Sequence, residues 1–211
     1  MATKPILYGF DGSTYVRTVR MLLAEKGADY DQVPVNVLKG EPRAPEHLAR
    51  HPFGKVPVMD IDGMRLLETD AICRYLDETL PGSSFIPANA RDRARMAEAI
   101  GLINSYGYPN MLFCIAQNLF PDFVGGKDEA AHEQARESSR TLLGLLMEKK
   151  GSDPWIAGKD PSLADFLLAP IWFYVTLTPD AGRLGDAPGL GAWWEAIQKM
   201  PSFKATEPDL G

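Results

Sequence analysis

The chain has 211 residues, of which 45% are hydrophobic and 24% are charged, so it can hold one large domain or two smaller domains with their own cores. Its formal net charge of −6 argues against nucleic acid or an anionic membrane surface as the main partner. No stretch has the apolar length of a membrane span, and the first residues lack the charged-then-apolar pattern of a signal peptide.

Cysteine and histidine usage indicates the compartment and argues against a metal. Cys73 and Cys114 lie far apart and form no CxxC motif, which suits a reducing cytoplasm and disfavours a dithiol redox mechanism. The histidines His47, His51 and His132 have no metal-ligand spacing. We therefore expect a cytoplasmic protein without a metal.

The first elements in chain order predict a parallel strand–helix–strand unit. Lys4–Tyr8 is an apolar run typical of a buried strand, and Ser13 precedes an amphipathic helix that Gly27 ends. Tyr30–Val37 predicts a second strand, which a right-handed crossover makes parallel to the first. Leu38–Arg50 has mixed charge and prolines, which indicates a loop with one helical turn.

A hairpin and a helix follow. The apolar runs Lys55–Asp60 and Met64–Glu68 flank Asp62-Gly63, a dipeptide that favours a tight hairpin turn. Thr69 is placed to begin the next helix. These elements complete a βαβ–ββα order, which predicts a thioredoxin-like α/β domain.

This hairpin region has the features that a short zwitterionic peptide requires. Pro57 lies inside the first run although proline has no N–H for a sheet, and a cis Val56-Pro57 bond would leave the backbone of Val56 free to pair with an extended peptide. Glu68 offers a carboxylate for an ammonium group, and the helix that begins near Thr69 offers N–H groups to an anion.

The rest of the chain predicts helices. Prolines and small polar residues mark a linker, so we expect a first domain at residues 1–80, a linker at 81–89 and an all-helical domain at 90–211. The expected helices are Ala90–Leu119, bent near Gly107 and Pro109, then Glu129–Lys149, Phe166–Leu177 and Ala192–Met200. Ser162 and Asp165 form a capping-box pattern, so we expect Asp165 to be a cap worth roughly 0.5–2 kcal/mol rather than a catalytic acid.

The stretch PFGKVPVMDIDGMRLLETDAI resembles the glutathione-binding half of the cytosolic glutathione S-transferases, with Thr69 at the usual serine and Asp70 where arginine is frequent. The segments PWIAGKDPSLADFLLAPI and PGLGAWWEAIQKMPSFKAT resemble the helical half of the same family, so the resemblance covers nearly the whole chain. It implies a thioredoxin-like domain followed by an all-helical domain, glutathione as co-substrate, and a homodimer.

The stretch YGFDGSTYVRTVR resembles the Ser-dependent classes of this family, most closely the plant-type phi class. A hydroxyl donor at a helix N-terminus would stabilise a thiolate, and the resemblance gives this role to Ser13. Two alternatives remain open: Ser13 is only a helix cap, or the neighbouring Thr14 is the donor. A serine at this position disfavours the mixed-disulfide chemistry of the cysteine-bearing classes.

The resemblance also implies how glutathione is held. Lys55 would bind the glycine carboxylate and Val56 the cysteinyl backbone, while Glu68 and Thr69 would bind the γ-glutamyl group. Arg43 matches a basic position of the family, next to a proline where phi members often have histidine. The electrophile would lie between the two halves, and its candidate contacts, which are equally typical of a core, are Phe10, Tyr106, Tyr108, Met111, Phe113 and Trp172.

We therefore expect an enzyme that conjugates the glutathione thiolate to small apolar electrophiles. The alternatives on the same fold are a glutathione-dependent isomerase, a dehalogenase or an ether-cleaving enzyme. A non-catalytic binding or scaffold protein is the alternative from another class, and an assay with an aromatic halide distinguishes it from an enzyme.

Overall fold

The computed structural model describes residues 4–208, which form two compact units. The first unit contains the described residues up to Ser84 and those from Lys199 onward, and the second contains Phe85–Gln198. The division after Ser84 falls within the expected linker at 81–89. The return of the chain to the first unit at Lys199 is a difference from the expected organisation, in which residues 90–211 form one domain.

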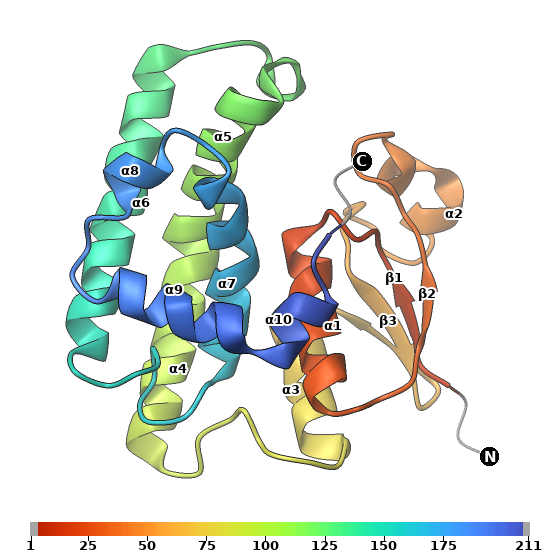
Figure 1. Ribbon diagram of the computed structural model, residues 1–211. Helices are drawn as coiled ribbons and strands as arrows, with labels where there is room; N and C mark the ends of the chain where they lie inside the picture. Colours follow the sequence, from red (N-terminus) through yellow and green to blue (C-terminus); the bar gives the residue numbers. More distant parts are fainter. Residues whose placement is uncertain (1–3, 209–211) are drawn as a thin grey trace. The chain divides into compact units, whose positions relative to one another are not determined.

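The first unit is built on a four-stranded sheet with the order β2-β1-β3-β4. Strand β1 (Ile6–Tyr8) pairs parallel with β2 (Asp31–Val33) and antiparallel with β3 (Val58–Ile61). Strand β3 pairs antiparallel with β4 (Met64–Leu67). This topology confirms the predicted thioredoxin-like βαβ–ββα arrangement (Figure 1).

Strand β2 is shorter than the predicted run Tyr30–Val37. Pro34 directly follows its last residue and has no N–H to donate to the sheet, so the ladder ends there. Val35 nevertheless packs in the core with Tyr8 and Val58. The connection to β3 contains a 3₁₀ turn at Glu41–Arg43 and the short helix α2 at Pro45–Leu48.

Helices α1 (Thr14–Glu25) and α3 (Thr69–Thr79) pack against each other beside the sheet (Figure 1). A buried ion pair joins their C-terminal ends, because Lys26 Nζ lies 2.9 Å from Asp77 Oδ1. The same ammonium donates to the carbonyl oxygens of Asp77 at 3.0 Å and Ser83 at 2.8 Å. These bonds fix the chain where it leaves α3.

A short C-terminal helix, α10 (Pro201–Ala205), packs on α1 and was not expected from the sequence. The buried guanidinium of Arg17 explains this contact. Its Nη2 donates to the carbonyl of Phe203 at 2.9 Å, and its Cζ lies 4.1 Å from the centre of the Phe203 ring. The Glu25 carboxylate also accepts a hydrogen bond from the N–H of Ser202 at 3.4 Å.

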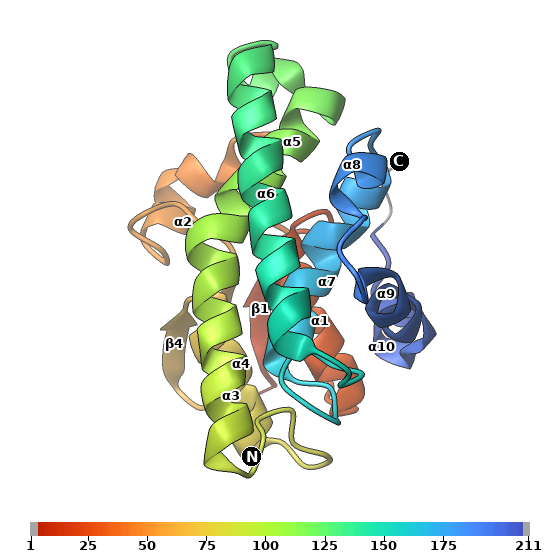
Figure 2. The same ribbon diagram turned by 90° about the vertical axis from the view of Figure 1, so that its left-hand side faces the viewer.

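The second unit contains helices only. The expected helix 90–119 is α4 (Ala90–Leu102), a π-helical turn (Ile103–Gly107) and α5 (Tyr108–Leu119), which follow one another along the chain. Helix α6 (Glu129–Lys150) runs beside them (Figure 2). Gly107 permits this packing, because a Cβ at that position would lie 2.2 Å from Cδ2 of Leu142.

The remaining helices complete the second unit. The central α7 (Leu163–Thr176) starts with the predicted capping box between Ser162 and Asp165. The rest are a 3₁₀ turn (Pro121–Val124), α8 (Ala181–Leu184), which the sequence pattern does not indicate, and α9 (Leu190–Lys199). Among residues 4–208, no helix combines the length and the apolar composition that crossing a membrane requires.

Candidate functional site

Ser13 is the N-cap residue of α1, at the end of the loop that follows β1. Its Oγ accepts a hydrogen bond from the N–H of Val16 at 3.4 Å, which is longer than the usual value of about 2.9–3.0 Å. The side chain is half-buried, and its hydroxyl proton has no acceptor in the part of the chain that the structure describes. Thr14 is the first residue of the helix and is more deeply buried.

The peptide bond between Val56 and Pro57 is cis, as predicted. Within residues 4–208, the backbone N–H and C=O of Val56 make no hydrogen bond to another backbone group. The loop before Val56 is held by His47, whose Nε2 donates to the carbonyl oxygen of Lys55 at 2.8 Å. A fixed backbone with free hydrogen-bonding groups is what an extended peptide needs as a pairing partner.

Glu68 occupies the turn between β4 and α3 in a strained conformation. Its φ of 69° and ψ of 122° put a residue with a large side chain in the left-handed half of backbone space. Such strain persists only where the surrounding fold imposes it, and it concentrates at functional sites. The Glu68 side chain is exposed, and Thr69, the first residue of α3, is buried beside it.

Two exposed basic residues, Arg43 and Lys55, belong to the loop around Gly54. A Cβ on Gly54 would lie 3.2 Å from Cδ of Arg43, so the Arg43 stem passes over Gly54, and Lys55 is the next residue along the chain. His51 lies within the same loop, where burial lowers its pKa and keeps it neutral at pH 7 despite the nearby Glu68 carboxylate. This side of the first unit thus offers cationic groups next to the cis bond.

The aromatic candidates lie in different surroundings. Phe10, in the loop before Ser13, is half-buried. Tyr106 projects from the π-helical turn with 62% of its surface exposed. Tyr108 and Phe113 on α5 are half-buried, whereas Met111 on α5 and Trp172 on α7 are buried.

Comparison with known proteins shows the family of this chain. Residues 4–78 match the family model described as "Glutathione S-transferase, N-terminal domain", and residues 107–201 match "Glutathione S-transferase, C-terminal domain". Glutathione S-transferase 3 of Zea mays is 31% identical over 95% of this chain and 91% of its own length. The chain belongs to the glutathione S-transferase family.

Other relatives agree in fold and differ in name. Glutathione transferase F7 from Populus trichocarpa superposes with a TM-score of 0.86 at 29% identity, covering 96% of this chain and 97% of the other. Maleylacetoacetate isomerase of Rhizobium meliloti is 33% identical over 81% of each chain. Because the plant relatives named here are glutathione transferases, we classify the protein as a transferase of phi-like type with glutathione as its co-substrate.

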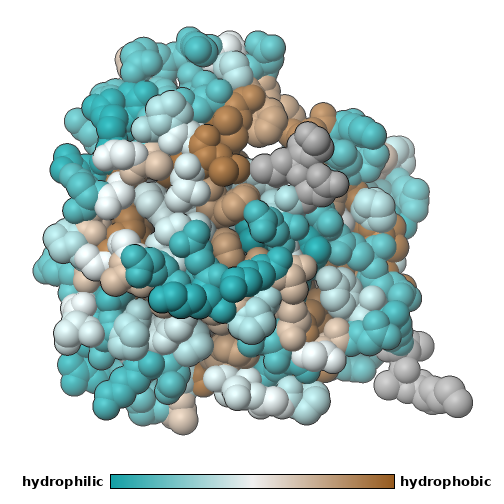
Figure 3. Space-filling model, viewed as in Figure 1, coloured by the Kyte–Doolittle hydropathy of each residue, from teal (hydrophilic) through white to brown (hydrophobic). Residues whose placement is uncertain are grey.

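The transferase has an exposed apolar stripe that sequence reasoning missed. Leu112, Leu119, Phe120 and Phe123 are all exposed, at the C-terminal half of α5 and the turn after it. Apolar atoms gather over α5 on the face shown in Figure 3. The spacing of seven between Leu112 and Leu119, which places both on one side of a helix, was the available signal.

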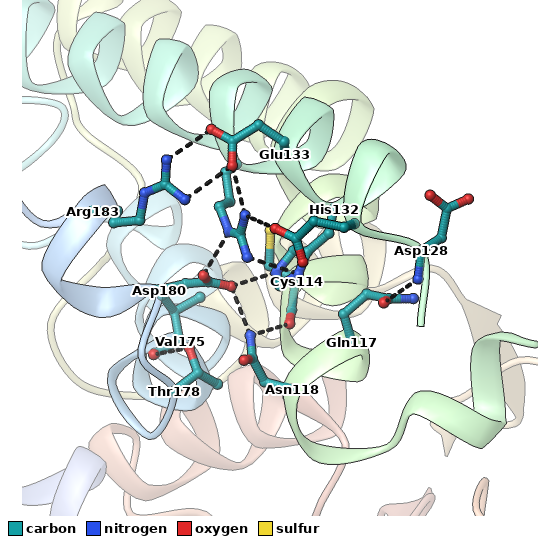
Figure 4. Close-up of polar contacts among 12 residues, drawn as sticks. Cys114, Gln117, Asn118, Asp128, His132, Glu133, Val175, Thr178, Asp180 and Arg183 are labelled. Atoms are coloured by element: carbon teal, nitrogen blue, oxygen red, sulfur yellow. Dashed lines mark hydrogen bonds and ion pairs between the residues drawn. The ribbon is translucent and has the colours of Figure 1, made fainter. Parts of the chain in front are cut away.

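A buried polar cluster in the second unit is the only metal-ligand group that the described residues contain. Ligand atoms of Cys114, His132 and Asp180 lie within 4.8 Å of one another, and Figure 4 shows these side chains converging from α5, α6 and the start of α8. His132 Nε2 lies 2.7 Å from Asp180 Oδ2, and Arg136 Nη2 lies 2.9 Å from His132 Nδ1.

Hydrogen-bond chemistry disfavours a metal in this cluster. Arg136 can only donate, so His132 Nδ1 accepts, and the Nε2–H of His132 donates a hydrogen bond to Asp180. A metal on Nε2 would require that proton to leave, beside a guanidinium that already pairs with Asp180 at 2.7 Å. The cluster is therefore an ion-pair network that joins three helices of the transferase.

Proposed function

We propose that this transferase conjugates the glutathione thiolate to small apolar electrophiles and that Ser13 stabilises the thiolate. A free thiol has a pKa of about 8.5, so only a few per cent is thiolate at neutral pH. Lowering that pKa by one unit requires about 1.4 kcal/mol of selective stabilisation. One charge-assisted hydrogen bond at the N-terminus of α1 supplies energy of this size.

The capping bond of Ser13 supports this role rather than competing with it. The cap uses a lone pair of Oγ, whereas thiolate stabilisation uses the hydroxyl proton. The two roles therefore do not exclude each other. The half-buried position of Ser13 also favours it over the buried Thr14 as the donor.

The groups in the hairpin region favour binding of the glutathione backbone there. Val56 offers unpaired N–H and C=O groups to the cysteinyl residue, while Glu68 and the N-terminus of α3 at Thr69 receive the γ-glutamyl group. Lys55 and Arg43 attract the glycine carboxylate. The strained backbone of Glu68 is the observation that most favours a functional role here.

The exposed and half-buried aromatic side chains support the proposal that the electrophile is apolar. Tyr106, Tyr108 and Phe113 present ring surface on the second unit, and Phe10 presents it on the first. The exposed stripe of α5 extends the apolar surface of the second unit. The burial of Met111 and Trp172 favours a core role for these two candidates.

Glutathione-dependent isomerisation is the second candidate, because maleylacetoacetate isomerase of Rhizobium meliloti is among the relatives. The two reactions differ in thiol balance. Conjugation consumes one thiol for each turnover, whereas isomerisation returns it. Thiol titration during turnover of an aromatic halide and, separately, of maleylacetoacetate distinguishes the two activities.

We further propose a cytoplasmic homodimer. Phe53, in the loop before β3, has 73% of its surface exposed, and an exposed aromatic ring of this size is typical of an interface. Both cysteines are free and buried, which suits a reducing compartment. Light scattering on a sizing column should report twice the mass of one chain, and Phe53→Ser should shift the enzyme toward the monomer.

The central experiment is the pH–rate profile of Ser13→Ala. Loss of a charge-assisted hydrogen bond, worth roughly 1.5–3 kcal/mol, should lower kcat/KM near neutral pH by about one to two orders of magnitude. The apparent pKa of the profile should rise toward that of the free thiol, and glutathione binding at low pH should change little. Ser13→Thr should keep part of the rate. Full activity with an unshifted profile would leave Ser13 as a cap and make Thr14→Ala the next variant.

A further inference from the structure

The loop that presents Ser13 is held at both ends by backbone bonds. The N–H of Gly9 donates to the carbonyl of Val33 at 3.0 Å, and the N–H of Ser13 donates to the carbonyl of Phe10 at 3.1 Å. Gly9 has a φ of 154°, and a Cβ there would lie 2.3 Å from Cγ2 of Val16. The loop therefore runs directly against the first turn of α1.

One side chain from the neighbouring strand fixes the middle of this loop. Gln32 on β2 donates through Nε2 to the carbonyl oxygen of Gly9 at 3.0 Å and to Oδ1 of Asp11 at 2.8 Å. The two acceptors come from different residues of the loop, so a single amide joins its start to its centre. Asp11 stands two residues before Ser13.

A cation compensates the charge of this carboxylate. Arg20 Nη1 lies 3.1 Å from the same Oδ1 of Asp11, and the Arg20 side chain is only 13% exposed. An uncompensated carboxylate near Ser13 would disfavour a thiolate by charge repulsion. Arg20 thus removes the electrostatic penalty, while Gln32 uses Asp11 to fix the loop.

We propose that Gln32 is a positioning residue that, through its hydrogen bonds to Gly9 and Asp11, holds the Ser13 hydroxyl where it donates to the glutathione thiolate. This inference rests on the proposed role of Ser13. A hydrogen bond weakens steeply as its angle and distance depart from the optimum. A shift of this loop should therefore weaken the bond from Ser13 to the thiolate, whereas the groups that bind the peptide stay in place. Gln32 reaches the reacting sulfur only through the loop, which separates its role from that of Ser13.

The test compares Gln32→Leu with Asp11→Asn. Gln32→Leu removes both bonds to the loop, and we expect the apparent pKa of the pH–rate profile to rise by about one unit, with kcat/KM at neutral pH falling about tenfold. The KM for glutathione at low pH should stay within about twofold, since the peptide site is unchanged. Asp11→Asn keeps an acceptor for Gln32 but removes the negative charge that compensates Arg20, so its profile should not move upward.

A double-mutant cycle separates this inference from the proposed function. If Gln32 acts through Ser13, adding Gln32→Leu to Ser13→Ala should cost no further activity. Gln134→Leu, an exposed glutamine on α6, is the control for the substitution and should leave the profile in place.

Three results would contradict either the role of Gln32 or the proposed function. A lower thermal midpoint for Gln32→Leu with an unshifted profile would reduce Gln32 to a structural residue. Fully additive losses in the cycle would also overturn the inference while leaving Ser13 as the donor. If Ser13→Ala itself is fully active, the proposed function fails first, whatever Gln32→Leu does.

Discussion

Asp165 has more partners than its sequence pattern indicates. The capping box accounts for the bond from the N–H of Ser162 to Oδ2 of Asp165 at 2.8 Å, and the Ser162 hydroxyl donates to the same oxygen, also at 2.8 Å. The other carboxylate oxygen, Oδ1, accepts from the N–H of Ile156 at 3.0 Å and from Nε1 of Trp193 at 2.8 Å. Asp165 therefore joins the start of α7 to the preceding loop and to α9.

Asp165→Ala should accordingly destabilise the enzyme more than loss of a simple cap. Each buried donor left without an acceptor costs about 1–3 kcal/mol, so loss of the acceptor for four donors should cost at least about 4 kcal/mol rather than 0.5–2. Urea unfolding measures this loss, and Asp165→Asn, which keeps acceptor capacity, should lose less. Glutathione affinity of the folded protein should stay unchanged, and lost affinity at unchanged stability would indicate a direct role in binding.

The two thiols should be inert in the folded enzyme. Burial raises the pKa of Cys114 to about 11 and raises that of Cys73 further. Labelling with an aromatic disulfide at pH 8 should therefore be slow and should report two thiols only after unfolding. Fast labelling of either cysteine in the native protein would contradict this.

At the scale of elements, the π-helical turn between α4 and α5 determines how the second unit packs. Gly107 ends this turn against α6, with no space for a Cβ beside Leu142. Within this wide turn the carbonyl of Tyr106 accepts a side-chain hydrogen bond from Nδ2 of Asn110 at 2.6 Å. Tyr106 is thereby presented from an irregular turn rather than from a regular helix.

Two glycine substitutions test this packing with the same chemical change. Gly107→Ala should destabilise the enzyme by about 1–3 kcal/mol, because the added Cβ forces α5 and α6 apart. Gly101→Ala in α4 meets no atom within 4 Å and should stabilise it by roughly 0.4–1 kcal/mol through helix propensity. Thermal and urea unfolding of both variants measure the difference, and equal effects would contradict the packing argument.

At the scale of the whole molecule, the network at Asp180 makes stability depend on pH. Burial by itself would raise the pKa of Asp180, but hydrogen bonds from His132 and Arg136 outweigh it and lower that pKa below its usual range. A carboxylate with a lowered pKa stabilises the fold at pH values above its unfolded pKa of about 3.9. This contribution is lost as pH falls through the folded pKa.

Asp180→Asn should therefore flatten the acid limb of the stability curve. We expect the wild type to lose free energy of unfolding more steeply than the variant below about pH 4, with a large difference at pH 7 that narrows in acid. The control is Asp186→Asn, which breaks an exposed ion pair with Arg140 and should change little. Parallel curves for wild type and Asp180→Asn would show that Asp180 does not carry the acid dependence.

The sequence predicts the fold well where local chemistry decides it. The turn at Asp62-Gly63, the cis bond at Pro57 and the start of α7 at Ser162 each follow from the preferences of one or two residues. Partners distant in the chain could not be predicted in this way. Nothing near Arg17 in the sequence indicates that Phe203 covers it, and nothing near Gln32 indicates that it holds the loop before Ser13.

The return of the chain to the first unit at Lys199 has a consequence for how the protein is made. The ribosome completes the strands and helices of residues 4–84 early, but α10, which covers the guanidinium of Arg17, is synthesised last. Domains generally fold as they emerge, N-terminal part first. Here α1 of the nascent first unit stays without its α10 partner while the entire second unit is translated, so the first unit cannot reach its final packing until translation ends.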